Sequence, residues 1–317
     1  MGEGRMKSRQ RDSSESPRFA QPPTFMRLPY QTDLSGVDVA IIGVPFDSGT
    51  SYRSGARMGP REIRSQSSLI RPYSYFQKVS PFGTLAVVDG GDIDVPPAGS
   101  IERAYEAIEI GVRRILNAGA IPIVAGGDHS ISLPCLRAVA ATHGPLSLIQ
   151  FDAHIDTWGD YFGGKYFHGS PFRRAIEEGL LKDGSYVQVG IRGPMYGEVE
   201  DFAFQNAHAV TMIDIGQVKR DGVERTLERI RHSVSGPVYV TFDIDSVDPA
   251  YAPGTGTPEV GGLTSYEAQE LVRGLAGLDV VGCDVVEVAP QFDGPGQITS
   301  LLAANLMFEL LCVIARR

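Results

Sequence analysis

Residues 146–156 read Leu-Ser-Leu-Ile-Gln-Phe-Asp-Ala-His-Ile-Asp, and this stretch decides how the rest of the chain is interpreted. The apolar run 146–151 predicts a buried strand. Asp152, His154 and Asp156 follow it, and in an extended backbone alternate side chains lie on the same face. Two carboxylates and an imidazole this close together are costly unless they are protonated, paired or bound to a cation. The stretch therefore indicates a divalent metal site at a strand end; solvated acids with a capping histidine are the alternative.

Two other apolar runs end in the same kinds of side chain. Residues 121–125 run into Gly-Gly-Asp-His-Ser at 126–130, and residues 238–242 run into Asp-Ile-Asp-Ser-Val-Asp-Pro at 243–249. In an open α/β sheet, ligands bind outside the carboxyl ends of the strands. Three strand ends that carry oxygen and imidazole ligands therefore argue for one shared site.

Strand-like runs and helical stretches alternate from residue 37 onwards. We expect strands at 37–44, 85–89, 121–126, 146–152, 186–192, 209–213, 238–245 and 280–288. Because these runs are apolar on both faces and helices separate most of them, they predict a mostly parallel sheet of about eight strands, covered on both sides. The expected fold class is α/β, a three-layer α/β/α sandwich. A closed eight-stranded barrel has the same alternation and is the alternative.

Capping residues indicate where the helices begin and end. Proline suits the first turn of a helix, serine and threonine the position before it, and glycine the position after its end. We therefore expect helices that begin at 59–60 and at Ser170–Pro171 (through Leu180), a helix at 101–118 between Ser100 and Gly119, and one at 265–277 after the capping-box pair Thr264 and Glu267. The run 297–315 is apolar nearly all round and predicts a buried helix.

The composition is that of a globular enzyme. Of 317 residues, 42% are hydrophobic and 21% are charged. The net charge of −9 argues against nucleic-acid binding, and no apolar run approaches the length of a membrane span. The first residues lack a secretory pattern, and the three cysteines (Cys135, Cys283 and Cys312) lie in apolar segments, where we expect reduced, inert thiols. A cytoplasmic location is expected.

The chain is expected to hold one domain. Residues 1–17 are polar and charged and predict a mobile N-terminal tail, so the catalytic domain is placed at 18–317. The proline-rich segment 21–29 cannot form a regular helix. Its apolar residues predict that it lies against the body or a neighbouring subunit.

The three strand ends offer carboxylates and imidazoles but no thiol. The six candidate metal ligands are His129, Asp152, His154, Asp156, Asp243 and Asp245. Oxygen-rich ligation suits manganese, nickel or cobalt better than structural zinc. Six side chains exceed what one catalytic ion with an open position needs, so they suit two ions with bridging carboxylates. Such a pair acidifies a bound water, which predicts hydrolysis; phosphoester and amide bonds stay open as targets.

The three strand-end motifs resemble those of the ureohydrolase (arginase/agmatinase) family. Segments 43–47, 57–60, 252–258 and 261–264 also match the family, so the resemblance covers nearly the whole chain from residue 37. The His-Gly-Ser-Pro-Phe of 168–172 and the Gly-Ile-Arg-Gly-Pro of 190–194 are similar to agmatinases and guanidinobutyrases rather than arginases. The resemblance implies an arginase-like α/β/α fold and a trimeric or hexameric homo-oligomer.

The resemblance also implies a role for each motif residue. Two divalent ions, manganese first and nickel or cobalt as alternatives, would be held by His129 and Asp156 on one side, by His154 and Asp245 on the other, and by Asp152 and Asp243 between them. His168 would carry a proton to the leaving amine, Glu287 would hold the guanidinium, and Asp156 would act with them in catalysis. The implied activity is that of a metal-dependent amidinohydrolase, which releases urea and an amine.

The tail of the guanidino substrate is not fixed by the sequence. Loop 157–167 carries both Asp160 and Lys165, and Arg192 and Tyr196 lie on another expected rim. The aromatic residues of the same loop either pack it as a lid or shape the tail pocket: Trp158, Tyr161, Tyr166 and Phe167. Family frequency favours an agmatine-like substrate; guanidinobutyrate, guanidinopropionate and small alkylguanidines are the alternatives.

Other functions and plainer roles stay open beside this interpretation. A metallo-amidase or formimino-hydrolase would act on C–N bonds without a free guanidinium, and a non-catalytic partner subunit would keep only the fold; the presence of every expected ligand disfavours the latter. Asp128 is expected to orient a loop or a neighbouring ligand, and Asp248 to form a turn. His143, His208 and His232 are expected to be surface or capping residues.

Overall fold

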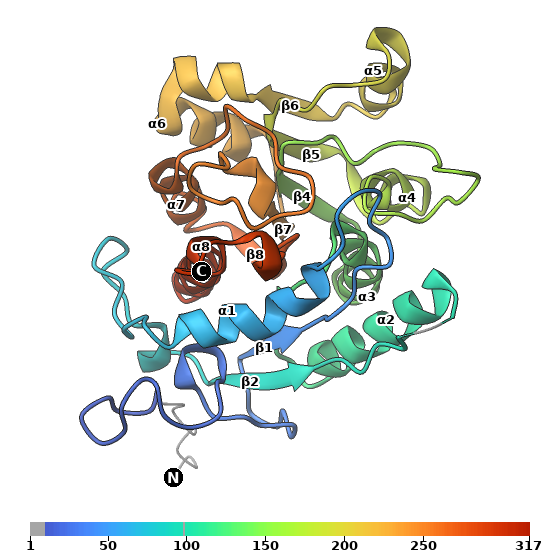
Figure 1. The fold of residues 1–317 in the computed structure, drawn as a ribbon. Helices are drawn as coiled ribbons and strands as arrows, with labels where there is room; N and C mark the ends of the chain where they lie inside the picture. Colours follow the sequence, from blue (N-terminus) through green and yellow to red (C-terminus); the bar gives the residue numbers. More distant parts are fainter. Residues whose placement is uncertain (1–9, 98) are drawn as a thin grey trace.

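A single parallel sheet forms the centre of the molecule. The computed structural model describes residues 10–97 and 99–317 (Figure 1). Within this part, the strands are β1 (Val39–Gly43), β2 (Val87–Asp92), β3 (Ile121–Ala125), β4 (Leu146–Phe151), β5 (Leu181–Ile191), β6 (Thr211–Asp214), β7 (Pro237–Asp243) and β8 (Asp279–Val286). They form one 8-stranded sheet in the order β2-β1-β3-β8-β7-β4-β5-β6, and every ladder is parallel.

This topology confirms the predicted fold class. Each strand overlaps a run expected from the sequence, and β2 and β6 form the two open edges of the sheet. The barrel alternative is therefore wrong, because a barrel would pair its first and last strands.

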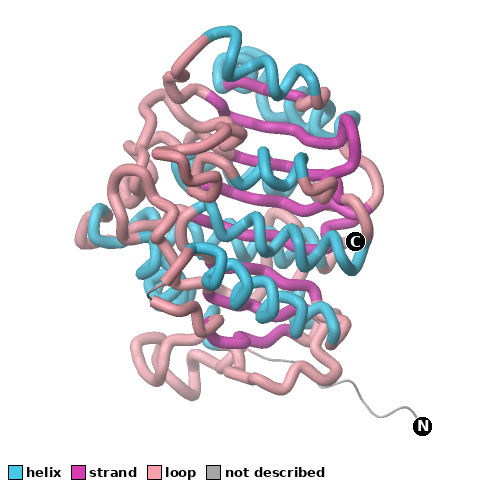
Figure 2. Tube along the Cα trace, turned by 90° about the vertical axis from the view of Figure 1, so that its right-hand side faces the viewer, coloured by secondary structure: helices cyan, strands magenta, loops and turns pink. Residues whose placement is uncertain are grey.

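Helices cover both faces of the sheet. They are α1 (Gly59–Ser67), α2 (Ile101–Asn117), α3 (Ser132–His143), α4 (Pro171–Glu177), α5 (Glu198–Ala207), α6 (Ile215–Ser233), α7 (Ser265–Arg273) and α8 (Ile298–Ile314). Residues of α1, α6, α7 and α8 share one apolar cluster with the sheet, and residues of α2, α3 and α4 share the other. Figures 1 and 2 show the resulting three layers, with the strands between the helices.

The alternation of side chains along each strand supplies both layers of core. On β1, Val39 and Ile41 pack into the first cluster, and Ala40 and Ile42 pack into the second. Helix α8 is buried along nearly its whole length, as its all-round apolar sequence predicts. Its one acid, Glu309, is paired with Arg273 of α7 at 2.7 Å.

The capping expectations are confirmed in part. Thr264 and Glu267 form the predicted capping box before α7, and Gly119 follows α2 with a φ of +79°. Ser100 and Ser170 occupy the N-cap positions of α2 and α4, but neither side chain caps the helix backbone. The Ser170 hydroxyl donates instead to carbonyls of the preceding loop, where 157–170 turns back on itself.

The N-terminal segment packs on the body of the protein. Phe25 and Met26 are fully buried, which confirms that the proline-rich segment lies against the domain. The expected mobile tail at 1–17 lies partly outside the described residues. From Gln10 onwards the chain contacts the rest of the protein; for example, the side-chain amide of Gln10 donates to the carbonyl of Ile70 at 2.7 Å.

The three cysteines are free and buried, as expected. Among the described helices, none has the length and apolar character that a membrane crossing requires.

Candidate metal centre

The sheet order brings the predicted ligands together. The neighbouring strands β3, β8, β7 and β4 all end at the same edge because the sheet is parallel. His129 follows β3, Glu287 follows β8, Asp243 ends β7 and Asp152 follows β4. Segments that are more than a hundred residues apart in the chain therefore deliver their side chains to one place, as expected for an open α/β sheet.

The same local turn follows each of the three motif strands. The Asp152 carboxylate accepts from the backbone nitrogen of His154 at 2.6 Å, and Asp243 accepts from that of Asp245 at 2.8 Å. Asp128 accepts from the backbone nitrogen of Ser130 at 3.0 Å. A short acidic side chain that bonds the backbone two residues on turns the chain sharply. The predicted extended geometry of 152–156 is therefore wrong, although its side chains do converge.

One group of possible ligand atoms surrounds His129. Its Nδ1 lies 3.0 Å from an oxygen of Asp152, 3.0 Å from one of Asp156 and 3.1 Å from one of Asp243. This nitrogen is buried and has no hydrogen-bond partner among the described residues. Adjacent ligands of an octahedral ion with bonds of about 2.1 Å lie about 3 Å apart. The spacing and the unpartnered nitrogen therefore fit a metal ion.

A second group shares one residue with the first. The Nδ1 of His154 lies 3.1 Å from an oxygen of Asp245 and 3.5 Å from the other oxygen of Asp152. Asp152 thus offers one oxygen to each histidine, which is the arrangement expected of a bridging carboxylate. The structure brings together all six predicted ligands, and they fit two divalent ions.

The electrostatics of the cluster require compensating positive charge. Burial, and then the charge of Asp152, raises the pKa of Asp156 to about 6. Burial, followed by Asp245 and Asp152, raises the pKa of Asp243 well above its usual range. A carboxylate whose pKa rises among other acids is ionised most easily when a cation is bound beside it.

A buried relay holds the ring of His129. The hydroxyl of Thr241 donates to the Asp284 carboxylate at 2.5 Å, so its lone pair is left to accept from Nε2 of His129 at 2.8 Å. Ser132 and Tyr239 also donate to Asp284. With its proton on Nε2, the ring presents the unprotonated Nδ1 to the cluster, which is the form that binds a metal.

His168 and Glu287 lie beside the ligand cluster. Nδ1 of His168 lies 2.9 Å from Oε1 of Glu287, and the same oxygen accepts from the backbone nitrogen of His129 at 2.9 Å. Burial alone would lower the pKa of His168, but the charge and hydrogen bond of Glu287 raise it to about 9. Both side-chain hydrogen bonds that Glu287 makes in the described part of the chain use Oε1, which leaves Oε2 for another donor.

Two residues at this edge have left-handed backbone conformations. Asp156 has a φ of +49° and Glu287 a φ of +63°. Such conformations cost about 1–2 kcal/mol each for a residue with a Cβ. The sequence predicts Glu287 inside a strand, whereas β8 ends one residue earlier at Val286 and the backbone turns there. Glu287 is nevertheless buried, as expected.

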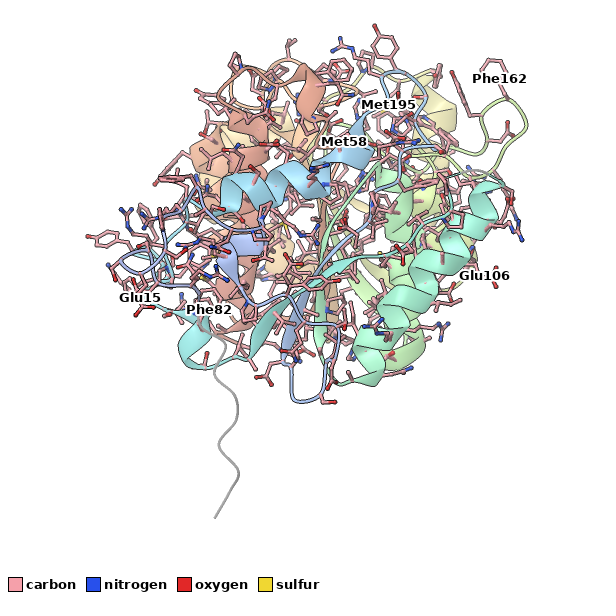
Figure 3. All side chains as sticks on the ribbon, turned by 60° about the horizontal axis from the view of Figure 1, so that its bottom comes forward. Glu15, Met58, Phe82, Glu106, Phe162 and Met195 are labelled. Carbon is pink, nitrogen blue, oxygen red and sulfur yellow. The ribbon has the colours of Figure 1, made fainter. Side chains whose placement is uncertain are left out.

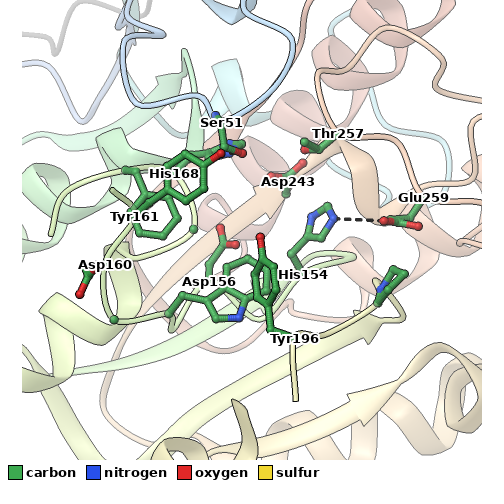
Figure 4. Close-up of a pocket in the computed structure, with 15 residues that line it drawn as sticks. Ser51, His154, Asp156, Asp160, Tyr161, His168, Tyr196, Asp243, Thr257 and Glu259 are labelled. Carbon is green, nitrogen blue, oxygen red and sulfur yellow. Dashed lines mark hydrogen bonds and ion pairs between the residues drawn. The ribbon is translucent and has the colours of Figure 1, made fainter. Parts of the chain in front are cut away.

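A pocket of about 460 Å³ opens over the cluster (Figure 4). His154, Asp156, Asp243 and His168 contribute to its wall, together with the aromatic side chains of Trp158, Tyr161, Phe167 and Tyr196. Of the predicted lid residues, Tyr166 packs instead against Tyr105, with ring centroids 5.3 Å apart. The aromatic residues of loop 157–167 therefore both line the pocket and pack the loop against the rest of the protein.

The charged residues of the two expected rims separate in the structure. Asp160 lines the pocket, and so does Glu259, whose carboxylate lies 3.6 Å from Nε2 of His154. The guanidinium of Arg192 donates to backbone carbonyls that include those of Asp245 and Glu259, and Lys165 lies over the ring of Tyr166. No lysine or arginine occurs among the described residues that line the pocket.

Several side chains at the site escaped the sequence analysis. Ser51 contacts Nε2 of His168 at 2.6 Å, and Thr257 donates to Asp245 at 3.3 Å. Glu259, Thr241 and Asp284 were also missed. Thr241 and Asp284 lie on β7 and β8. A polar residue inside an apolar strand was the signal available for those two, whereas the loop residues gave none.

Two acidic residues, Asp128 and Asp248, shape loops through hydrogen bonds to the backbone, as expected from the sequence. Asp128 accepts from the backbone nitrogen of Gly49 at 2.7 Å, and Asp248 accepts from those of Ala250 and Gly261 at 2.9 and 2.6 Å. These bonds shape the loops around the pocket. The remaining expected surface or capping histidines lie at the ends of helices: His143, His208 and His232.

Curated relatives match nearly the whole chain. A guanidinopropionase of Pseudomonas aeruginosa is 50% identical over 96% of this chain and 95% of its own length. A guanidinobutyrase of the same organism is 46% identical over 95% of each chain. A mitochondrial agmatinase of Gallus gallus is 44% identical over 92% of this chain and 85% of its own.

Solved structures and a family model agree with these relatives. A proclavaminate amidinohydrolase from Streptomyces clavuligerus superposes with a TM-score of 0.90 and 44% identity, over 95% of this chain and 99% of that one. A formiminoglutamase of Trypanosoma cruzi, solved with Mn2+2, has a TM-score of 0.83 and 25% identity over 94% and 100% of the two chains. The arginase family model matches residues 37–312. The chain therefore belongs to the arginase family and is one of its hydrolytic enzymes.

Proposed function

We propose that this enzyme hydrolyses the guanidino C–N bond of a small guanidino compound and releases urea and an amine. The observation that carries the proposal is the pair of ligand groups that share Asp152 at the floor of a pocket walled by His168. Two divalent ions, for which we propose manganese, would supply a hydroxide nucleophile near neutral pH when bound there. Nickel and cobalt suit the same ligands.

Each of the site residues has a role in the proposed reaction. His129, Asp152, His154, Asp156, Asp243 and Asp245 would hold the ions, and Asp156 also contributes to the pocket wall, where it would act in catalysis. Glu287 offers Oε2 to the guanidinium, whose planar N–H groups pair well with a carboxylate. His168 donates a proton to the leaving nitrogen, and its raised pKa keeps that proton available at neutral pH.

The pocket charges support an agmatine-like substrate with a cationic tail. Asp160 and Glu259 line the pocket, and the described lining contains no positive side chain apart from histidine. A tail ammonium would be attracted by these carboxylates, whereas a tail carboxylate would be repelled. The relatives named guanidinopropionase and guanidinobutyrase, at 50% and 46% identity, favour a guanidino acid as the second candidate.

The test is urea release from a panel of guanidino compounds by the enzyme reconstituted with manganese or nickel. The panel contains agmatine, 4-guanidinobutyrate, 3-guanidinopropionate, arginine, guanidine and dimethylguanidine. We expect agmatine to give the highest kcat/KM. A higher value for either guanidino acid would select the second candidate. If no compound of the panel released urea while both ions were bound, guanidino hydrolysis would be contradicted. Release of ammonia or formamide in place of urea would indicate a different C–N substrate.

We further propose that the enzyme acts as a cytoplasmic homo-oligomer, a trimer or hexamer, without a nucleic-acid partner. The excess of acidic residues supports the last point. Light scattering of the metal-loaded enzyme measures the oligomeric state, and a monomer would contradict the proposal.

A further inference from the structure

A second cleft lies far from the candidate metal centre, between the N-terminal segment and the loop that precedes β2. Its volume is about 550 Å³, and four arginines line it: Arg11, Arg18, Arg27 and Arg71. Phe82 forms part of the opposite wall. Figure 3 shows Glu15 and Phe82, which mark the two segments, well away from Phe162 and Met195, which mark the loops around the metal-site pocket.

Among the described residues, carboxylates do not balance the positive charge of this cleft. Asp12 is the one carboxylate among its described lining residues, against four guanidinium groups. Its carboxylate accepts from the backbone and hydroxyl of Ser14 at 2.8 and 2.7 Å, which lowers its pKa and keeps it ionised. Within residues 10–97 and 99–317, none of the four arginines forms an ion pair within 4.0 Å. A net positive cleft on a chain of net charge −9 is a local exception.

Arg27 is the buried member of the cluster. Its residue is 8% exposed, and its Nε is a buried donor without a partner among the described residues. One terminal nitrogen donates to the carbonyl of Ser16 at 2.6 Å, which ties the N-terminal segment over the cleft. The backbone at Met26 and Arg27 is left-handed, with φ values of +49° and +60°. A desolvated guanidinium with an unused donor is costly unless an acceptor occupies the space beside it.

We propose that this cleft binds a small multivalent oxyanion of the phosphate class. Guanidinium groups present planar forks of N–H donors that match phosphate oxygens in pairs. An anion placed here would accept from Nε of Arg27 and reduce the repulsion among the four cations. Arg71, which is exposed, and Arg18, which is half-buried, would close on it from the solvent side of Arg27. The volume falls within the range of small-molecule sites.

Calorimetric titration of the full-length, metal-loaded enzyme tests the proposal. The probes are inorganic phosphate, pyrophosphate and citrate at constant ionic strength, with chloride as the reference salt. We expect saturable binding of phosphate and tighter binding of pyrophosphate, with citrate weaker than both. Arg18→Gln combined with Arg71→Gln should weaken phosphate binding at least tenfold, and Arg27→Gln should do the same. The exposed Arg225→Gln on α6, far from the cleft, is the matched control and should bind as the unsubstituted enzyme does.

The double variant keeps the test valid if Arg27→Gln fails to fold, and far-UV circular dichroism checks both. Phosphate binding that persists unchanged in the double variant would overturn the proposal, because it would belong to the metal centre. An equal loss of phosphate binding in Arg225→Gln would also overturn the proposal, because the loss would then follow from the change in net charge and not from the cleft. Binding of citrate alone would overturn the phosphate class. Dissociation of an oligomer by the double variant, with no phosphate binding to the original enzyme, would assign the cleft to a subunit contact instead.

Discussion

Oε1 of Glu287 lies 2.9 Å from Nδ1 of His168, although 119 residues separate them. On the other side of the ring, the backbone N–H of Ser51 donates to Nε2 at 3.1 Å, a bond that only the neutral ring accepts. Glu287 favours the protonated ring and Ser51 accommodates the neutral one. A histidine with a partner for each state is well suited to pass a proton back and forth.

The pH dependence of the reaction should reflect the pKa of His168, which Glu287 raises. Burial lowers the pKa of His168, and Glu287 more than compensates, so the ring stays protonated up to about pH 9. Since the protonated ring is the proposed donor, kcat/KM should fall as the pH rises through about 9. Urea release measured from about pH 7 to about pH 11 gives the profile. His168→Gln should remove most of the activity together with this alkaline limb; a limb that remains in that variant would contradict the assignment.

Loss of a histidine ligand should remove metal and activity together. In His154→Ala the second ligand group retains only carboxylates, so we expect activity to fall by about 100-fold or more and the content of bound metal to decrease. Elemental analysis and urea release are measured on the same preparation. His232→Ala, at the end of α6, is the control. Full occupancy of both ions in His154→Ala would show that this ring is not a ligand.

The rim carboxylates should set the preference for the substrate tail. Asp160 lines the pocket but contacts none of the candidate metal ligands, so Asp160→Asn removes only a charge at the rim. The ratio of kcat/KM for agmatine to kcat/KM for 4-guanidinobutyrate should then fall roughly fivefold. Lys165→Gln, outside the pocket lining, should leave the ratio unchanged. Glu259→Gln should lower the ratio and also weaken metal binding, because Glu259 faces Nε2 of His154 at 3.6 Å. An unchanged ratio in both carboxylate variants would assign tail selectivity to the aromatic residues.

The relay behind His129 should control metal affinity rather than substrate affinity. Thr241→Val removes the hydroxyl that joins Nε2 of His129 to Asp284, and outer partners of this kind contribute about 10–100-fold in metal affinity. Competition with a chelator measures the affinity, and KM should change little. Thr241→Ser, which keeps the hydroxyl, should restore binding. Equal loss in the serine variant would indicate a packing defect.

The capping box before α7 should stabilise the fold without affecting the site. Thr264→Ala removes a side-chain acceptor for the backbone nitrogen of Glu267, which costs about 1 kcal/mol in the free energy of unfolding. Ser265→Ala, the next residue, is the control. Urea denaturation measures both, and a change below the error of the fit in Thr264→Ala would show that the box contributes nothing.

The sequence predicts what depends on local periodicity. All eight strands were found because apolar runs between helices are a local signal, and the six candidate ligands, whose side chains the structure brings together, could be named because each follows such a run. The geometry that joins them was partly wrong. Asp156 meets His129 through a turn with a positive φ, not through the alternation of an extended strand. Short acidic side chains that bond their own backbone produce that turn, and a count of strand periodicity does not include them.

What the sequence misses depends on contacts between distant segments. Ser51 and His168 come from different loops, and so do Glu259 and His154. Similarly, Asp160 and Lys165 belong to one short loop and are equivalent in the sequence, yet only Asp160 faces the pocket. The direction of each side chain follows from how its loop packs, and no signal within the loop itself specifies it.

The pocket is assembled from two kinds of chain segment with different constraints. Part of the pocket wall comes from residues that follow β4 or end β7, such as His154 and Asp243, whereas Asp160, Tyr196 and Glu259 come from three loops outside the eight-stranded sheet. A substitution in these loops can alter which substrate fits while the reacting groups keep their positions. Substrate selectivity in this architecture can therefore change independently of the reaction itself, through a few substitutions at the rim.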